Sequence, residues 1–405
     1  MQTSARFQAV LDLVTAVLAD KQPADGIINE YLRARKYIGS KDRRFITDWV
    51  WKIVRNRLKF EFEAGSKEPR KVWLAAIREE NLNEIFDGGQ YAPAALNTEE
   101  LAWLNAFSDK PYPEFVEAEC PQWLYGRIND MALCKALNHP APADFRVNFK
   151  NREDVIRQLA GEGIEAVPTP YSPYGIRINE RISLGNCIAY QEGAIEVQDE
   201  ASQLAAILCD VKPEHKIMDY CCGAGGKSLM FAHILNNQGH ILAHDVNVRR
   251  LEAIKPRLQR LGVKNIELTD LVADSDRDFD RFVIDAPCTG TGTWRRAPDG
   301  KFRLSEGLLK GIVKTQREIL ETGAVKTKAG GRLIYIPCSI RAEEDEQQID
   351  SFLAAHPEFM PVNMKDLWEK KINQPYPYHS EKYLKTSPLS TGTDGFFISV
   401  LEKLA

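Results

Sequence analysis

The strongest constraint on the fold is the regular alternation of short apolar segments with helical patterns after about residue 201. Apolar segments that predict buried strands lie at residues 216–219, 241–245, 266–268, 281–285 and 332–337. Helical patterns separate them, at residues 228–235, 248–261 and 304–326. Strands that alternate with helices form a parallel, doubly wound sheet, which binds ligands at the carboxyl ends of its strands. The sequence therefore predicts a Rossmann-like α/β fold with a binding site at that edge.

Two other patterns precede this region. Apolar residues at helical spacing, such as Phe7, Val10 and Val14, predict helices in the first ~70 residues. From about residue 145 a small α/β unit is expected, with a strand at 145–149, a helix at 152–161 and strand-like segments around Ile176 and at 188–197. We therefore divide the chain into a helical domain, a small α/β unit and a doubly wound domain, at residues 1–140, 141–200 and 201–405.

Composition limits the class of protein. The chain has 405 residues, of which 44% are hydrophobic and 27% charged, and this balance is typical of a folded globular protein. No stretch reaches the ~20 apolar residues of a membrane span, and the N-terminus does not resemble a signal peptide. We therefore expect a cytoplasmic protein with no membrane partner. The eight cysteines have no CxxC spacing, so neither a metal site nor a disulfide framework is expected.

The net charge of −4 does not by itself indicate a nucleic-acid partner. Residues 1–71 nevertheless carry 15 Lys and Arg against 9 Asp and Glu. That excess fits either a solvated helical surface or a surface that faces RNA.

A glycine-rich turn follows the first strand of the doubly wound domain. Its glycines allow the backbone to approach a ligand, and the following helix offers free N–H groups. The turn is neither a phosphate-binding P-loop nor a dinucleotide fingerprint, because Cys221 and Ser228 stand where those motifs require glycine. The candidate cofactor-binding residues in the turn are Cys221, Cys222, Gly223, Ala224, Gly225, Gly226 and Lys227.

Three successive strands after this turn each end in an aspartate. Asp245 lies ~20 residues beyond the turn, where a carboxylate can accept both hydroxyls of a ribose. Asp270 and Asp285 end the next two strands. Any one of them could be a helix cap or a solvated acid, but the three together favour a bound nucleoside.

Cys288 and Cys338 follow the fourth and fifth strands, so both are expected at the ligand-binding edge. A buried cysteine is usually an inert packing residue. A thiol beside a nucleoside cofactor suits attack on C6 of a pyrimidine, after which C5 can take a methyl group from a sulfonium donor. Asp285 is the candidate acid at the ring nitrogen. A thiol protease is disfavoured, because neither cysteine motif contains a histidine.

At these residues the sequence resembles the Fmu/Sun family of S-adenosylmethionine-dependent RNA cytosine-5 methyltransferases, especially the bacterial small-subunit ribosomal RNA members. The resemblance covers roughly residues 145–403. It includes VQDEAS at 197–202, the turn at 221–227, DAPCTGTGT at 285–293, RRAPD at 295–299, CS at 338–339 and GTDGFF at 392–397.

The resemblance implies a role for each site residue. Cys338 would be the nucleophile and Cys288 would assist product release. Residues 221–227, Asp245, Asp270 and Asp285 would hold S-adenosylmethionine. Two features depart from the family pattern: Pro337 replaces the usual Thr before the nucleophile, and Cys222-Gly223-Ala224 replaces Ala-Ala-Pro. DNA cytosine methyltransferases use a Pro-Cys nucleophile after the fourth strand, so Pro337 does not decide the roles.

Two other regions of the chain also resemble domains found in this family. The N-terminal helices resemble a NusB-type RNA-binding domain, through their periodicity and the neighbourhoods of Asp42-Arg43-Arg44 and Val54-Arg55. The small α/β unit resembles the family's RNA-recognition-motif-like extension. Four basic residues are expected either to contact RNA phosphates or to belong to an ordinary solvated loop, namely Arg295, Arg296, Lys301 and Arg303.

The leading hypothesis is methylation of C5 of a cytosine in 16S ribosomal RNA. The same chemistry on transfer RNA is the alternative within enzymes. A non-catalytic RNA-binding ribosome assembly factor with this fold is the alternative outside them, and the retention of both cysteines and Asp285 disfavours it.

Overall fold

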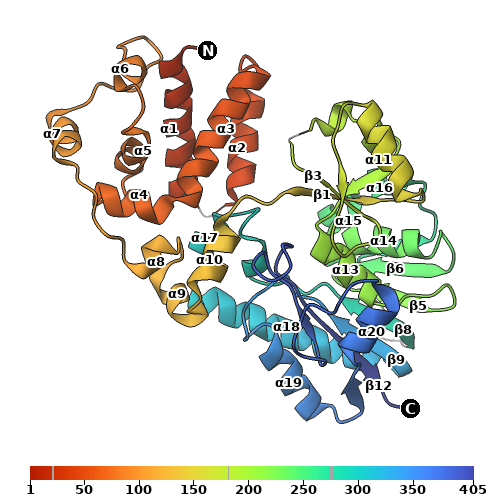
Figure 1. The fold of residues 1–405 in the computed structure, drawn as a ribbon. Helices are drawn as coiled ribbons and strands as arrows, with labels where there is room; N and C mark the ends of the chain where they lie inside the picture. Colours follow the sequence, from red (N-terminus) through yellow and green to blue (C-terminus); the bar gives the residue numbers. More distant parts are fainter. Residues whose placement is uncertain (21, 181, 273–277) are drawn as a thin grey trace. The chain divides into compact units, whose positions relative to one another are not determined.

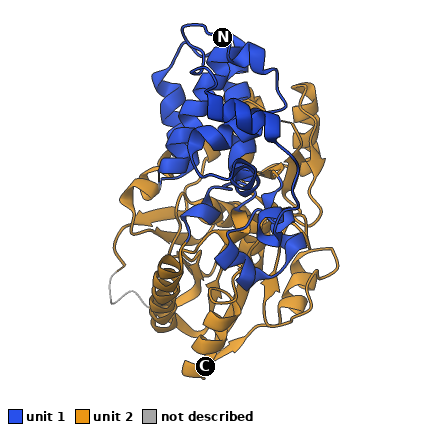
Figure 2. Ribbon diagram, turned by 90° about the vertical axis from the view of Figure 1, so that its left-hand side faces the viewer, with its two compact units in different colours: residues 1–139, 294–304 blue, residues 140–293, 305–405 orange. Residues whose placement is uncertain are grey.

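The computed structural model describes residues 1–20, 22–180, 182–272 and 278–405, which form two compact units (Figures 1 and 2). The first unit is Met1–His139 together with Trp294–Leu304. The second unit is Pro140–Thr293 together with Ser305–Ala405.

Helices build the first unit, as the N-terminal periodicity predicts. They are α1 (Thr3–Ala19), α2 (Ala24–Ala34), α3 (Ser40–Arg55), α4 (Arg57–Ala64), α5 (Pro69–Ile77), α6 (Leu82–Ile85), α7 (Thr98–Ala106), α8 (Glu114–Glu117), α9 (Gln122–Ile128), α10 (Met131–Asn138) and α17 (Gly300–Arg303). The apolar faces of α1, α2, α3, α5 and α6 share one core that includes Val10, Val50 and Trp73. Phe7 of this core packs edge-on against Phe45 and Trp49, with ring centroids 5.3 and 5.2 Å away.

The segment Trp294–Leu304 packs with these helices although it lies in the middle of the region expected to form the doubly wound domain. Arg55 donates through Nη2 to the carbonyl of Arg295 at 2.7 Å. The carboxylate of Asp299 accepts the backbone N–H of Ala24 at 3.1 Å. These contacts join residues more than 200 positions apart, so no local pattern in the sequence could predict them.

A four-stranded antiparallel sheet opens the second unit, with strand order β2-β3-β1-β4. Its elements are β1 (Ala143–Val147), α11 (Arg152–Gly161), β2 (Val167–Pro168), β3 (Gly175–Ile178), the short 3-10 helix η1 (Leu184–Asn186), α12 (Ile188–Gln191) and β4 (Ile195–Val197). The predicted strand over 188–197 is therefore only partly right, because its first four residues are helical. Gly193 ends that helical turn with φ +73°, and a Cβ there would lie 2.5 Å from the carbonyl oxygen of Arg260.

The larger sheet of the second unit has strand order β10-β12-β9-β8-β5-β6-β7, and β11 pairs with β12 beside it. Its parallel strands are β5 (Lys216–Asp219), β6 (His240–His244), β7 (Ile266–Thr269), β8 (Phe279–Ile284) and β9 (Thr327–Tyr335). Its antiparallel strands are β10 (Phe359–Pro361), β11 (Leu384–Lys385) and β12 (Phe397–Lys403). The α/β architecture is confirmed, but the sheet is mixed rather than wholly parallel, because β12 pairs antiparallel with β9.

Helices cover both faces of this sheet (Figure 1). They are α13 (Glu200–Leu208), α14 (Gly226–Ile234), α15 (Val248–Glu252), α16 (Lys255–Leu261), α18 (Glu306–Lys326), α19 (Glu346–Ala355) and α20 (Met364–Lys371). Neighbouring strand residues belong to different cores: Ile217 packs with α13, α14 and α20, and Met218 with α18 and α19. This alternation has the period of a strand and is typical of a sheet that is buried on both sides.

One predicted helix is divided in two. The helical pattern over 248–261 forms α15 and α16, which meet near Ile254. Pro256 lies in the first turn of α16, where a missing N–H is tolerated.

Candidate active site

The glycine-rich turn connects β5 to α14 as predicted. Gly225 has φ +78°, and a Cβ at this position would lie 2.9 Å from the side chain of Ile254. Only glycine meets both conditions without strain. Cys221 and Cys222 flank the start of the turn, and burial raises the pKa of both thiols. These two cysteines are therefore neutral at ordinary pH, and they shape the turn rather than react.

Asp245 follows β6 and lies against this turn. Its side chain is buried, and its two carboxylate oxygens accept the backbone N–H groups of Gly223 at 2.9 Å and Asn247 at 2.7 Å. Each carboxylate oxygen can accept a second hydrogen bond, so the group retains capacity for ribose hydroxyls. Asp270 follows the neighbouring strand β7 at the same edge and is exposed.

Lys227 connects the turn to the end of β8. It is buried, and its Nζ lies 2.7 Å from Oδ1 of Asp285. Burial alone would lower the pKa of Lys227, but Asp285 and Asp219 outweigh it and raise that pKa. Burial raises the pKa of Asp219 to about 7, and its Oδ2 accepts from Ser228 Oγ at 2.5 Å. The ammonium group of Lys227 is thus paired with Asp285 and also stabilised by the field of Asp219.

The two predicted active-site cysteines lie side by side. The ladder between β8 and β9 continues past both strands, since Ile336 N donates to Ile284 O at 2.9 Å and Ala286 N donates to Ile336 O at 3.2 Å. This continuation brings Sγ of Cys288 to 3.1 Å from Sγ of Cys338. Both thiols are free and half-buried.

The environment distinguishes the two thiols. The pKa of Cys288 lies well above the usual thiol range. The main cause is the hydrogen bond with Cys338, and burial is the second cause. The Cys288 thiol therefore retains its proton at ordinary pH, and either sulfur can donate in the hydrogen bond between the two thiols.

Glu344 is a site residue that the sequence analysis missed. It is fully buried, and its carboxylate contacts the residue that follows each cysteine: Thr289 after Cys288 and Ser339 after Cys338. Glu344 lies in the acidic run 343–346, which has the composition of a solvated helix start. The only feature of the sequence that could have indicated a role for Glu344 is its position six residues after Cys338.

The four predicted RNA-contacting residues lie in the first unit, whereas the cysteines, the turn and the three aspartates lie in the second. Arg295 and Lys301 are buried. Lys301 donates to Asn138 Oδ1 at 2.9 Å, and burial lowers its pKa to about 8. Arg303 is exposed and pairs with Asp299 at 3.1 Å, and Arg296 is half-buried. Burial gives Arg295 and Lys301 packing roles in this unit, so Arg296 and Arg303 are the better candidates for a phosphate contact.

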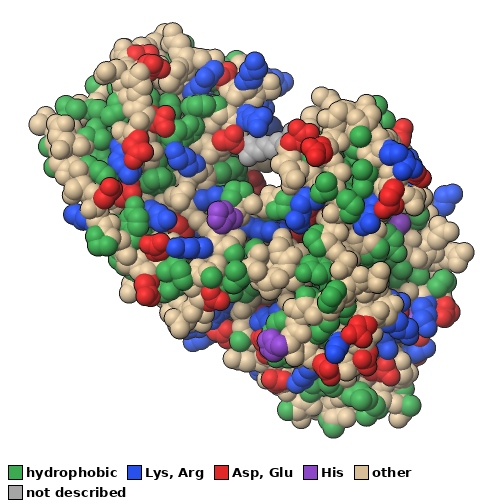
Figure 3. Space-filling model, in the orientation of Figure 1, with side chains coloured by type: hydrophobic (Ala, Val, Ile, Leu, Met, Phe, Trp, Pro, Cys, Tyr) green, Lys and Arg blue, Asp and Glu red, His purple; other side chains and the backbone are tan. Residues whose placement is uncertain are grey.

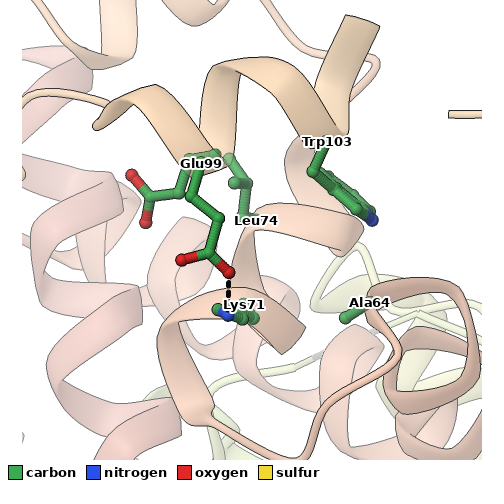
Figure 4. Close-up of a pocket in the computed structure, with 6 residues that line it drawn as sticks. Ala64, Lys71, Leu74, Glu99 and Trp103 are labelled. Carbon is green, nitrogen blue, oxygen red and sulfur yellow. Dashed lines mark hydrogen bonds and ion pairs between the residues drawn. The ribbon is translucent and has the colours of Figure 1, made fainter. Parts of the chain in front are cut away.

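A small pocket in the first unit offers no comparable chemistry. It is lined by Leu74 and Trp103 beside charged groups that are already paired (Figure 4). Lys71 pairs with Glu99 at 2.6 Å, and Glu100 pairs with Arg70 at 2.6 Å. Within the described ranges no cluster of His, Cys, Asp and Glu side chains could hold a metal ion. The described helices also include none that is both long and apolar enough to cross a bilayer.

The residues at the strand ends fit S-adenosylmethionine. The cofactor carries a ribose diol, an ammonium group and a sulfonium cation. Asp245 offers acceptors for the diol, and the buried Asp219 has one oxygen, Oδ1, without a hydrogen-bond partner. The turn supplies a backbone that a ligand can approach. The fold and this site define the class of protein, an S-adenosylmethionine-dependent methyltransferase.

Comparisons with known proteins identify the family. Residues 206–402 match the family model "16S rRNA methyltransferase RsmB/F", and residues 120–184 match its ferredoxin-like domain model. The chain is 28% identical to the probable ribosomal RNA small subunit methyltransferase B of Bacillus subtilis, over 88% of this chain and 83% of that protein. It is also 28% identical to ribosomal RNA small subunit methyltransferase B of Pseudomonas putida, over 99% of this chain and 88% of that protein.

A solved structure agrees with these matches. The crystal structure of PH0851 superposes with a TM-score of 0.78 at 25% sequence identity, and the match covers 100% of both chains. The chain belongs to the Fmu/Sun family of S-adenosylmethionine-dependent RNA methyltransferases. The resemblance stated from the sequence is thereby confirmed, together with the cofactor.

Proposed function

We propose that this protein methylates C5 of a cytosine in small-subunit (16S) ribosomal RNA through a covalent bond between Cys338 and C6. The observation that carries this proposal is the 3.1 Å approach of Cys288 and Cys338 at the strand edge that also holds Lys227 and Asp285. The names of the relatives from Bacillus subtilis and Pseudomonas putida support small-subunit ribosomal RNA as the substrate.

Cys338 performs the first step. Its sulfur lies 3.1 Å from Sγ of Cys288, and an S–H donated by Cys288 stabilises negative charge on Cys338. The thiolate adds to C6 of the cytosine, and Asp285 serves as the acid at the ring nitrogen, so that C5 becomes nucleophilic. Lys227 holds the carboxyl group of Asp285 in place from the side of the turn. When bound, S-adenosylmethionine supplies the electrophilic methyl group that C5 takes.

Cys288 performs the last step. Once Cys338 is bonded to C6, its sulfur no longer takes part in the hydrogen bond that raises the pKa of Cys288. The thiolate form of Cys288 becomes accessible at that stage. It then removes the proton from C5, the C6–sulfur bond breaks, and Cys338 leaves as a thiolate. The ring nitrogen returns its proton to Asp285.

We also propose that residues 221–227, Asp245, Asp270 and Asp285 hold the cofactor and that the first unit binds RNA. Arg33, Lys36 and Lys41 are exposed near the end of α2 and the start of α3. Lys and Arg side chains gather over these helix ends on the face drawn in Figure 3. A basic surface of this kind attracts phosphates without reading sequence.

The test is bisulfite sequencing of RNA from a strain that lacks this protein, followed by methyl transfer in vitro. Bisulfite deaminates cytosine but not 5-methylcytosine. We expect one protected cytosine of 16S ribosomal RNA to become sensitive, and the purified protein to restore the methyl group with labelled S-adenosylmethionine. Loss of protection in transfer RNA instead would favour the alternative substrate. Unchanged RNA and no label would favour the non-catalytic assembly factor.

A further inference from the structure

One buried carboxylate ties together the two loops that carry the cysteines. Oε1 of Glu344 accepts the backbone N–H of Thr289 at 2.8 Å, and its Oε2 accepts the Thr289 hydroxyl at 2.5 Å. Oε2 also accepts the hydroxyl of Ser339 at 2.8 Å. Oε1 takes a further hydrogen bond from Gln316 Nε2 on α18, at 3.1 Å. Both oxygens are thus occupied by donors from three parts of the fold.

The position of this carboxylate is specific. Thr289 immediately follows Cys288, and Ser339 immediately follows Cys338. The backbone of Glu344 is also fixed, because its carbonyl accepts a hydrogen bond from the hydroxyl of Tyr335, at the end of β9, at 2.8 Å. A buried charge that only filled space would be unfavourable, since burial without partners penalises a carboxylate by several kcal/mol. The hydrogen bonds offset that penalty at the point where the two loops meet.

The contacts of Glu344 lie mainly on the Cys288 side of the pair. Both of its oxygens contact Thr289, one of them through the backbone N–H next to Cys288, whereas only Oε2 reaches Ser339 and only through the hydroxyl. Its negative charge therefore favours the protonated form of Cys288, in agreement with the raised pKa of that thiol. The other charged or titratable groups around the pair are Lys227 and Asp285 at the turn and at the end of β8, Tyr335 on β9, and the Asp345–Lys385 pair beside Glu344.

We propose that Glu344 is a positioning residue, which fixes the two cysteine loops against each other and biases the negative charge of the thiol pair toward Cys338. The division of labour in the proposed function rests on this bias, because the cysteine that attacks must be the thiolate. Glu344 touches neither substrate nor cofactor in this role. It acts through Thr289, Ser339 and the field at Cys288.

The test measures the reactivity of each thiol separately, without RNA. The full-length protein is alkylated with iodoacetamide between pH 6 and pH 10, and the labelled peptides that contain Cys288 and Cys338 are quantified by mass spectrometry. In the wild-type protein we expect Cys338 to react at lower pH than Cys288. In Glu344→Gln the pH midpoint of Cys288 should fall by about one unit, which corresponds to about a tenfold faster reaction at pH 8.

The matched control is Glu343→Gln. Glu343 is the preceding carboxylate and pairs with Arg341 at 2.6 Å. This variant should leave both midpoints unchanged. Glu344→Asp keeps the charge on a shorter side chain, so it should restore the wild-type Cys288 midpoint more fully than Glu344→Gln does. If Glu344→Gln does not fold, Thr289→Val removes one hydroxyl donor and leaves the charge. It should lower kcat for methyl transfer about fivefold, at an unchanged KM for RNA, as expected for a lost positioning hydrogen bond.

The outcomes separate this inference from the proposed function. An unchanged Cys288 midpoint in Glu344→Gln, or equal shifts at both cysteines, would overturn the role of Glu344 even if the protein methylates cytosine. A Cys288 midpoint that falls in a protein without methyltransferase activity would support the role of Glu344 and refute the proposed function. Normal kcat in Thr289→Val would also count against the positioning role.

Discussion

Gly395 donates its backbone N–H to the carbonyl of Gly292 at 2.8 Å, although the two residues lie more than 100 positions apart. Gly292 in turn donates its N–H to the carbonyl of Cys338 at 3.1 Å. A Cβ on Gly292 would lie 1.9 Å from the carbonyl oxygen of Gly395. The loop after Cys288, the loop that carries Cys338 and the segment before β12 are therefore packed at backbone distance.

Gly292→Ala should destabilise this junction, because the overlap is with backbone atoms that cannot rotate away. We expect the free energy of unfolding to fall by about 3 kcal/mol and methyl transfer to be lost. Urea unfolding and a transfer assay measure both. Gly307→Ala is the control: its Cβ meets open space at the start of α18, so stability should be unchanged or up to about 1 kcal/mol higher. Wild-type stability in Gly292→Ala would contradict the close backbone packing at this junction.

Asp245→Asn should weaken cofactor binding. The two oxygens of the carboxylate accept the N–H groups of Gly223 and Asn247, so the substitution removes the charge and leaves one oxygen that can accept only one of these N–H groups. We expect a loss of about 1.5–3 kcal/mol in binding free energy, measured by calorimetric titration with S-adenosylmethionine. Glu252→Gln on the following helix α15, where Glu252 pairs with Lys255, should bind like the wild-type protein. Equal affinity in both variants would remove Asp245 from the cofactor site.

The basic residues near position 300 should form two groups: replacement of some should weaken RNA binding, and replacement of others should lower stability. Replacement of Arg296 and Arg303 by Ala should reduce the slope of log affinity against log salt by about one for each phosphate that the variant no longer binds. Lys301→Met should instead lower stability, since Lys301 is buried against Asn138 and is one of two cations, with Lys59, that act on the buried Glu119. RNA binding is measured by fluorescence anisotropy at several salt concentrations. An identical slope in the double variant would count against RNA contacts at these residues.

The stability of the second unit should depend on pH through His233. Its Nδ1 accepts the backbone N–H of Phe149 at 2.9 Å, and burial, with a contribution from Arg146, lowers its pKa to about 4. The folded pKa lies below the ordinary value of 6.5, so the folded state prefers the neutral ring. The contribution of neutral His233 to the free energy of unfolding is fully present above pH 6.5. It decreases by about 2–3 kcal/mol as the pH falls toward 4.

His233→Asn tests this dependence, because an amide oxygen can accept the same hydrogen bond without titrating. The difference in unfolding free energy between the variant and the wild-type protein should move in favour of the variant between pH 7 and pH 4.5. Urea unfolding at the two pH values measures it. A constant difference would mean that His233 does not titrate on unfolding.

Much of the fold could be predicted from the sequence because it depends on local periodicity. The strand that ends at Asp219, the glycine turn after it and the strand ends at Asp285 and Cys338 all follow from apolar segments and their breaks. The antiparallel pairing of β12 with β9 and the packing of Trp294–Leu304 with the N-terminal helices could not be predicted in this way. They depend on partners far along the chain, as does the role of Glu344, whose acidic neighbours suggest a solvated surface.

The division of labour between Cys338 and Cys288 is tested most directly by trapping the protein–RNA bond. Cys338→Ala and Cys288→Ala are each incubated with labelled substrate RNA and S-adenosylmethionine and separated by denaturing gel electrophoresis. Cys288→Ala should accumulate a denaturant-resistant adduct, because it forms the bond from Cys338 to C6 but breaks it slowly. Cys338→Ala should give neither adduct nor methylated RNA. If both cysteines only fill space, neither variant forms an adduct and turnover stays near normal. An adduct that persists in Cys338→Ala and vanishes in Cys288→Ala would contradict the assignment of Cys338 as the nucleophile.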